Sequence, residues 1–279
     1  MVASTISTDS PRPLSALLTA GHPLVMGILN VTPDSFSDGG RFFDPDVAVT
    51  HARQMAADGA DILDIGAEST RPYGGATPVT ADEERRRLER VLPAVTALGL
   101  PVSIDTMKAS VADWAVRAGA AIINDVWGLQ RDPDMAGVVA KHGVPVIVMH
   151  NREQADAGDI MADIDAFFVR SLAIAERAGV ARSKIVLDPG IGFGKTPEQS
   201  MTAIARLAEL KHFGLPLLVG ASRKRFIDRI APAPPDRRIG GSIASHVLAV
   251  QNGAAIIRAH DVPETVQALR VLAALRSRL

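Results

Sequence analysis

Two carboxylates and an amide stand at the ends of three apolar runs of the sequence. Asp105 ends PVSID, Asn124 is the last residue but one of AIIND, and Asp188 ends KIVLD. Carboxylate and amide oxygens accept hydrogen bonds, so together they suit a ligand edge that carries several N–H donors, such as a cyclic guanidine. The same residues could instead form a metal site or a buried network that fixes the fold.

Cationic side chains indicate a second, anion-binding part of the same site. Arg71 lies in a long polar segment, and Arg258 and His260 come at the end of the last apolar run, AAIIRAHD. The planar guanidinium of arginine binds phosphate through two parallel hydrogen bonds. Arg258 could alternatively form a salt bridge to Asp261 or Asp188.

A neutral oxygen ligand completes this set. Asn30 ends the first apolar run, LVMGILN. Mg²⁺ in proteins is commonly held by one or two side chains together with substrate phosphates and water. Asn30 is therefore predicted to contact a Mg²⁺ ion shared with a substrate diphosphate.

Two other motifs are weaker than they first look. PGIGFGKT (residues 189–196) resembles a phosphate-binding P-loop, but that motif requires glycine where Pro189 stands. The segment therefore does not predict a nucleotide triphosphatase. SRKRF (residues 222–226) could be a nucleic-acid patch, yet its neighbours are not basic. It follows the seventh apolar run, which favours a ligand role for Lys224.

These residues must be positioned by a repeated element, and the chain repeats one eight times: a glycine, then a short apolar run with a polar end. The glycines are Gly21, Gly59, Gly99, Gly119, Gly143, Gly179, Gly214 and Gly253. The runs cover residues 24–30, 62–66, 101–105, 121–125, 144–150, 184–188, 215–222 and 254–261. Glycine after a helix and before a buried strand predicts a helix-to-strand junction. Eight junctions predict one α/β domain, a (β/α)8 (TIM) barrel, with its active site at the carboxyl ends of the strands.

The remaining segments define the limits of this domain. Long segments rich in Gly, Pro, Ser and Asp follow the first two runs, at residues 31–43 and 67–79, and loops of this length are commonly functional. Residues 1–20 are expected to form a flexible extension, and residues 21–279 the barrel. At 279 residues the chain has no room for a second full domain.

Composition excludes several classes of protein. The formal charge of −1 argues against binding to nucleic acid or to an anionic membrane, and no apolar stretch approaches the ~20 residues of a membrane helix. The chain contains no cysteine, which excludes thiolate nucleophiles and thiolate metal sites. We expect a cytoplasmic protein.

Seven ordered motifs resemble the dihydropteroate synthase family of folate biosynthesis. They are NVTPDSFSDGG, GAESTRPYGG, SIDT, IND, LDPGIGFGKT, VGASRKRF and IIRAHDV, which together span residues 30–262. The resemblance implies a transferase that joins a dihydropterin diphosphate to 4-aminobenzoate and releases 7,8-dihydropteroate and diphosphate, with Mg²⁺ as cofactor. A related pterin-binding barrel of the methyltransferase type and a catalytically silent barrel are the alternatives. The methyltransferase type has no need of a diphosphate site, and the intact set of acids, cations and loops argues against a silent barrel.

The resemblance also implies a role for each matching residue. The pterin is expected to contact Asp105, Asn124, Asp188, Lys224 and Arg258. The diphosphate is expected to contact Asn30, Thr70, Arg71, Arg258 and His260, with Asn30 also at the metal. The aminobenzoate is expected to lie among Phe36, Pro72, Phe193 and Ser222.

Catalysis is implied to depend on Asp38, Arg71 and Lys224. Loss of diphosphate leaves positive charge on the pterin methylene, which a carboxylate such as Asp38 would stabilise. This describes a dissociative, SN1-like route. The resemblance further implies a homodimer formed through outer helices.

Overall fold

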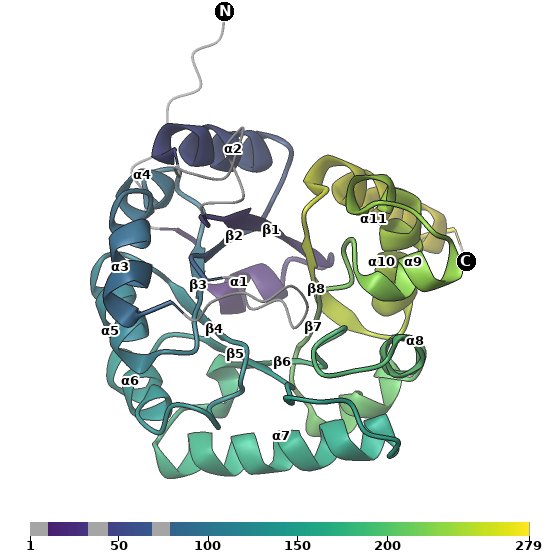
Figure 1. Cartoon of the computed structure of the whole chain (residues 1–279). Coiled ribbons are helices and arrows are strands. Elements are labelled where there is room, and N and C mark those ends of the chain that lie inside the picture. The colour runs from purple at the N-terminus through teal and green to yellow at the C-terminus, as the bar shows by residue number, and fades with distance from the viewer. Residues whose placement is uncertain (1–10, 33–43, 69–78, 279) are drawn as a thin grey trace, which may run out of the picture.

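Eight parallel strands form a closed barrel, in which each strand pairs with the next and β8 pairs with β1 (Figure 1). The structure, a computed structural model, describes residues 11–32, 44–68 and 79–278. The strands are β1 (Leu24–Asn30), β2 (Ile62–Gly66), β3 (Val102–Asp105), β4 (Ile122–Asp125), β5 (Val146–Met149), β6 (Ile185–Asp188), β7 (Leu217–Val219) and β8 (Ala254–Ala259). Each lies inside one of the eight apolar runs, so the predicted barrel is confirmed.

Helices surround the barrel and connect its strands (Figure 1). They are α1 (Leu14–Leu18), α2 (Pro45–Ala57), α3 (Ala81–Glu89), α4 (Leu92–Thr96), α5 (Ala109–Arg117), α6 (Met135–His142), α7 (Ile160–Arg177), α8 (Pro197–Ala205), α9 (Arg225–Ile230), α10 (Ile239–Gln251) and α11 (Val262–Arg276), with short 3-10 helices η2 (Arg182–Lys184), η3 (Leu207–Phe213) and η4 (Pro235–Arg237). Local sequence sets several of their starts. At α8 the Thr196 side chain accepts from the Gln199 backbone N–H while the Gln199 side chain accepts from the Thr196 backbone, a complete capping box.

The glycines of the repeat have the backbone conformation that the junction requires. All eight have positive φ, between 62° and 108°. Gly143, for example, follows α6 directly in the left-handed region, and its N–H donates to the Val139 and Ala140 carbonyls. A side chain is strained in that conformation, so glycine ends the helix and lets the chain turn into the next strand.

The barrel interior is apolar towards the amino ends of the strands, which we call its base, and polar towards their carboxyl ends. Its apolar layer consists of Leu24, Met26, Ile62, Ile122, Ile147, Val186, Leu218 and Ile256, packed with Leu14 and Leu17 of α1. Figure 1 shows α1 in the middle of the ring of strands. Residues 14–18 therefore differ from the loose extension expected for residues 1–20, because two leucines of this short segment are buried at the base of the barrel.

Strand register relates the polar side chains at the carboxyl ends of the strands. Gly66 of β2 pairs with Asp105 of β3, and Asp105 pairs with Asn124 of β4. Across the barrel, Met149 of β5 pairs with Asp188 of β6. The three predicted acceptors thus come from strand ends that open on the same face of the barrel, its mouth.

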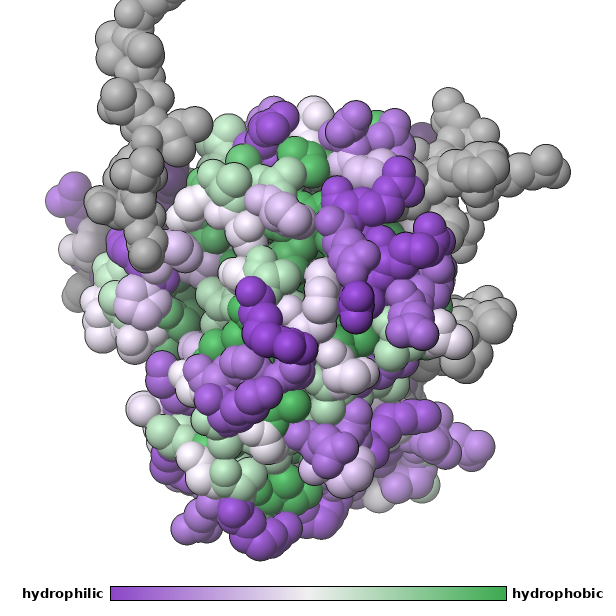
Figure 2. Space-filling view, turned by 90° about the vertical axis from the view of Figure 1, so that its left-hand side faces the viewer, coloured by the Kyte–Doolittle hydropathy of each residue, from purple (hydrophilic) through white to green (hydrophobic). Residues whose placement is uncertain are grey.

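The outer surface over the helices mixes hydrophilic and apolar residues (Figure 2). On α3, exposed arginines pair with glutamates one turn away, as in the Arg85–Glu89 pair at 2.8 Å. Such pairs add little to stability, but they keep the outer face of the helix polar. None of the helices in the described ranges is long and apolar enough to cross a membrane.

Candidate active site

A buried ion-pair network lies at the centre of the barrel mouth. The Arg258 guanidinium, from β8, donates from Nε to Asp64 Oδ2 at 2.6 Å and from Nη2 to Asp105 Oδ2 at 2.8 Å. Asp64 is fully buried and Asp105 nearly so. Each bond is charge-assisted and lies away from water, which fixes the arginine between β2 and β3.

This arrangement differs from the ion pairs considered for Arg258 from the sequence. Neither Asp261 nor Asp188 is its hydrogen-bonded partner; Asp261 is paired with Arg223 instead. The reason is the direction of the Arg258 side chain. Arg258 points into the barrel, whereas Asp261 follows the strand and lies at the start of α11.

Asn124 joins the same network through its amide. Its Nδ2 donates to Asp64 Oδ2 at 3.2 Å, the oxygen that also accepts from Arg258. Among the described residues, no donor reaches the buried Oδ1 atoms of Asp105 and Asn124. Buried acceptors without a donor are rare and costly, so a site for N–H donors is the natural explanation.

Burial makes the acids of the mouth harder to ionise than usual. It raises the pKa of Asp105, and Arg258 opposes this shift while Asp64 adds to it. Burial likewise raises the pKa of Asp188 to about 6, against the lowering effect of the Gly190 N–H and the Lys224 charge. Perturbed acids that gather in one place are typical of functional sites.

The glycine-rich segment after β6 forms one wall of the mouth. Asp188 Oδ1 accepts from the Gly190 N–H at 2.7 Å. The ammonium group of Lys224 lies 4.1 Å from the centre of the Phe193 ring, a cation–π contact between the segments that follow β6 and β7. The predicted residues Asp188, Phe193 and Lys224 are therefore neighbours.

A buried lysine holds this wall in place. Lys195 is 2% exposed, and its Nζ donates to the carbonyls of Gly190 (2.9 Å) and Phe193 (3.2 Å) and contacts His150 Nδ1 at 2.6 Å. A Cβ on Gly190 would lie 1.9 Å from the His150 carbonyl oxygen, so only glycine fits there. These contacts explain the residues of the P-loop-like motif: its lysine binds backbone carbonyls.

Ser222 and His260 meet on the neighbouring part of the mouth, after β7 and β8. Ser222 Oγ lies 3.2 Å from the His260 N–H and 3.1 Å from its Nδ1. Beside them, Arg223 has a φ of 58° and forms an ion pair with Asp261. The turn after β7 is thereby tied to the end of β8.

Asn30 lies near the acids at the end of β1. A Cβ built on Gly66 would be 3.9 Å from Asn30 Oδ1 and 3.7 Å from Asp105 Oδ2. A side chain at position 66 would contact both oxygens, so Asn30 Oδ1 and Asp105 Oδ2 lie in the same part of the mouth.

Five of the predicted site residues lie outside the described residues. They are Phe36, Asp38, Thr70, Arg71 and Pro72. The structure does describe the two ends of the second segment: Glu68 Oε1 accepts from the Val79 N–H at 3.1 Å. Lys108 donates to both Glu68 and the fully buried Glu84, which ties these ends to α3 and α5.

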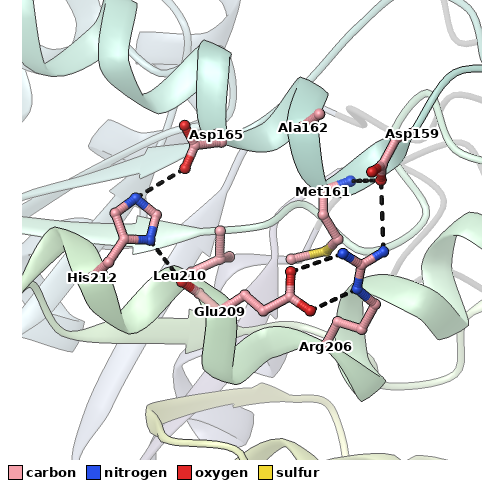
Figure 3. A pocket seen from close by; sticks show the side chains of 8 residues that line it. All are labelled: Asp159, Met161, Ala162, Asp165, Arg206, Glu209, Leu210 and His212. Atoms are coloured by element: carbon pink, nitrogen blue, oxygen red, sulfur yellow. Dashed lines mark hydrogen bonds and ion pairs between the residues drawn. The ribbon is translucent and has the colours of Figure 1, made fainter.

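A surface pocket of about 310 Å³ lies away from the mouth, between α7 and the α8–η3 segment (Figure 3). Its charged residues pair with one another: Arg206 with Glu209 at 2.7 Å, and His212 with Asp165 at 2.9 Å. It contains none of the predicted site residues. We therefore place the candidate active site at the barrel mouth.

Sequence reasoning missed Asp64. Its signal was present in ILDIG, where an acid interrupts a run that is otherwise apolar and buried. Charged residues are rarely buried without a partner, so such an acid indicates a paired cation in the barrel. The cation is Arg258, 194 residues away in the chain.

Comparison with known proteins identifies relatives over nearly the whole chain. A model of the pterin binding enzyme family matches residues 26–260. Dihydropteroate synthase of Bacillus subtilis (strain 168) is 48% identical over 262 residues, which cover 94% of this chain and 91% of the relative. The Xanthomonas albilineans dihydropteroate synthase solved with 4-aminobenzoic acid is 44% identical with a TM-score of 0.89, covering 96% of this chain and 99% of that one. A structure of the enzyme from the same organism in complex with 7,8-dihydropteroate is 42% identical with a TM-score of 0.85, covering 92% and 95%.

Proposed function

Because the chain belongs to the dihydropteroate synthase family of pterin-binding enzymes, we propose that its barrel mouth binds the pterin against Asp105, Asn124 and Asp188. The enzyme is a transferase that condenses a pterin with 4-aminobenzoate. Within this activity, the role of each residue and the route of the reaction are our proposals.

One observation carries the pterin site: Asp105 and Asn124 stand at strand ends that open on the mouth, and a buried oxygen of each has no donor among the described residues. The amino group and ring N–H of a pterin would supply those donors. Asp188 adds a carboxylate on the far side of the barrel, and Lys224 beside it would donate to the pterin's carbonyl edge. Arg258 lies beneath the ring and holds Asp105 in position.

The diphosphate is proposed to lie between Asn30 and His260, at the ends of β1 and β8, with Thr70, Arg71 and Arg258 as further contacts. The described residues contain no cluster of three or more acidic, histidine or cysteine side chains that could hold a metal ion by themselves. A single amide oxygen at the mouth fits Mg²⁺, which takes its other ligands from phosphate and water. When bound, Mg²⁺ would neutralise charge on the departing diphosphate.

The aminobenzoate is proposed to lie against Phe193 and Ser222, where Phe36 and Pro72 would complete its pocket. The Phe193 ring offers an apolar face, and the Lys224 ammonium on that ring adds positive charge beside it. Ser222 would donate to the carboxylate of the substrate. This places the amine on the side of the pterin that bears the methylene carbon.

The reaction is proposed to be dissociative. The C–O bond to diphosphate breaks and its electron pair leaves with the oxygen, while Arg71 and Arg258 stabilise the anion. Asp38 stabilises the positive charge that develops on the methylene and the pterin ring. The nitrogen of aminobenzoate then forms a bond to this carbon with its lone pair, and the resulting ammonium group gives one proton to the released diphosphate or to water, which requires no strong base.

A homodimer is also proposed. Leu248 of α10 and Val271 and Leu275 of α11 are exposed apolar side chains on two adjacent outer helices. A second copy of the chain could cover them. Light scattering at assay concentration measures this directly, and the cytoplasmic location expected from the sequence remains a prediction.

The test of the function is diphosphate release with both substrates, with either substrate alone, and with variants. Release only with both substrates supports the proposal. Asp105→Asn should weaken pterin binding by about 10- to 100-fold, the cost of one charge-assisted bond. Asp113→Asn, on the outside of α5, is the matched control and should bind pterin like the wild type. Equal affinity in the two variants would exclude Asp105 from the site.

A further inference from the structure

We propose that Asp64 is a specificity-determining positioning residue: it fixes the direction of the Asn124 amide, so that an acceptor oxygen faces the ligand. This inference rests on the proposed pterin site. It assigns a function to a buried acid that itself lies below the ligand.

The contacts of one oxygen atom carry the argument. Asp64 Oδ2 accepts from Arg258 Nε at 2.6 Å and from Asn124 Nδ2 at 3.2 Å. Both donors reach the same atom of a side chain that has no exposed surface. The carboxylate can only accept, so the amide of Asn124 must present its NH2 group to it.

The opposite orientation of the amide is unfavourable. If the Asn124 side chain turned over, its oxygen would face Asp64 Oδ2, and two acceptors would meet without a hydrogen. The NH2 group would then point to the mouth and would repel an N–H-rich ligand edge. Losing a buried hydrogen bond and leaving a charged acceptor short of a donor is costly. Asp64 therefore selects the orientation in which Asn124 Oδ1 accepts from the ligand.

The register explains why Asp64 acts through Asn124. Asp105 is level with Gly66 and Asn124, whereas Asp64 pairs with Ser103, two residues further from the mouth. Side chains two residues apart on a strand point to the same face, so Asp64 points into the barrel one layer below Asp105. Its hydrogen-bonded contacts Asn124 and Arg258 are the residues through which it can act on the mouth.

The experiment removes the acceptor of this hydrogen bond. In Asp64→Leu, a side chain of similar size cannot accept from the Asn124 NH2 group, so the amide is free to turn over. Calorimetry then measures two probes, 6-hydroxymethylpterin and its 2-desamino analogue. The ratio of their affinities reports recognition of the amino group, which a simple loss of packing would not change selectively.

The wild type should prefer the pterin by about 10- to 100-fold. Asp64→Leu should reduce this preference by about tenfold, because nothing then selects the orientation of the Asn124 amide. Asp64→Asn should keep it, because the single oxygen of the new amide can accept from both Arg258 and Asn124, as Asp64 Oδ2 does. Ser103→Ala is the matched control: its buried hydroxyl has no partner among the described residues, and its removal should leave the ratio unchanged.

Three results would overturn the proposal. They are an unchanged ratio in Asp64→Leu, an Asp64→Asn variant that folds but loses the preference, and failure of both variants to fold while Ser103→Ala folds. The last result would make Asp64 only a structural partner of Arg258. Failure of the pterin site itself would be distinct, because the wild type would then fail to bind 6-hydroxymethylpterin.

Discussion

Replacing Asp188 by asparagine is expected to stabilise the fold and to weaken pterin binding in the same variant. Burial raises the pKa of Asp188 from 3.8 to about 6. A carboxylate that is harder to ionise in the folded state makes folding less favourable above that pH. The difference corresponds to about 3 kcal/mol at neutral pH. Asparagine carries no charge, and its oxygen can still accept from the Gly190 N–H.

Proton binding determines how this stability difference changes with pH. Between about pH 4 and pH 6 the folded protein holds the Asp188 proton more tightly than the unfolded chain, so the free energy of unfolding falls as pH rises. In Asp188→Asn this titration is absent, so its free energy of unfolding does not fall in this way. The stability of the variant relative to the wild type should therefore be higher by about 1–2 kcal/mol at pH 5 and by about 3 kcal/mol at pH 7.5. Urea unfolding followed by circular dichroism at both pH values measures the change.

Binding should change in the opposite direction. The variant loses one charge-assisted acceptor, so its affinity for 6-hydroxymethylpterin should fall by about 10- to 100-fold at pH 7.5. Asp125→Asn is the control, because Asp125 is equally buried, has a pKa raised by burial to about 6, and accepts from the Trp127 and Leu129 N–H groups outside the mouth. It should bind the pterin normally. An Asp188→Asn protein that is less stable than the wild type at pH 7.5, or that binds pterin equally well, would refute this reasoning.

Three further predictions concern the loops, the order of binding and the base of the barrel. Asp38→Asn should lower kcat far more than it weakens pterin binding, because its charge acts on the transition state; steady-state kinetics with a near-normal kcat would remove it from the mechanism. 4-Aminobenzoate should bind tightly only when pterin and diphosphate are present, and equal affinity for the free enzyme by calorimetry would contradict ordered binding. Leu17→Ala should lower the free energy of unfolding by about 2–5 kcal/mol without changing KM, since Leu17 is buried below the site. A shifted KM with unchanged stability in urea would show that α1 acts on the mouth instead.

The sequence was sufficient to predict the barrel because each strand carries its own signal. Gly143 and Gly214, for example, end their helices in the left-handed conformation and lead into β5 and β7. Asp105, Asn124 and Asp188 could also be placed together, because the carboxyl ends of parallel strands meet on one face. These inferences need only local patterns and the topology.

The partners of buried charges could not be predicted in the same way. Arg258 had several acids within plausible reach, and only the tilt and register of the strands decide that it meets Asp64 and Asp105. The loose extension expected at the start of the chain is a similar case. Leu14 and Leu17 lack a long amphipathic pattern, and their burial depends on an apolar surface that eight distant strands build.

The position of α1 has a consequence for the order in which the molecule assembles. Its two leucines contact an apolar layer to which β8 contributes Ile256, near the end of the chain. The surface that receives the first helix is therefore incomplete until the last strand is in place and pairs with β1. During synthesis, α1 leaves the ribosome well before β8, and its contacts with Ile256 span more than two hundred residues of the sequence. Contacts of such long range form slowly. Docking of this short helix is therefore a late step of folding, which is complete only after the barrel has closed.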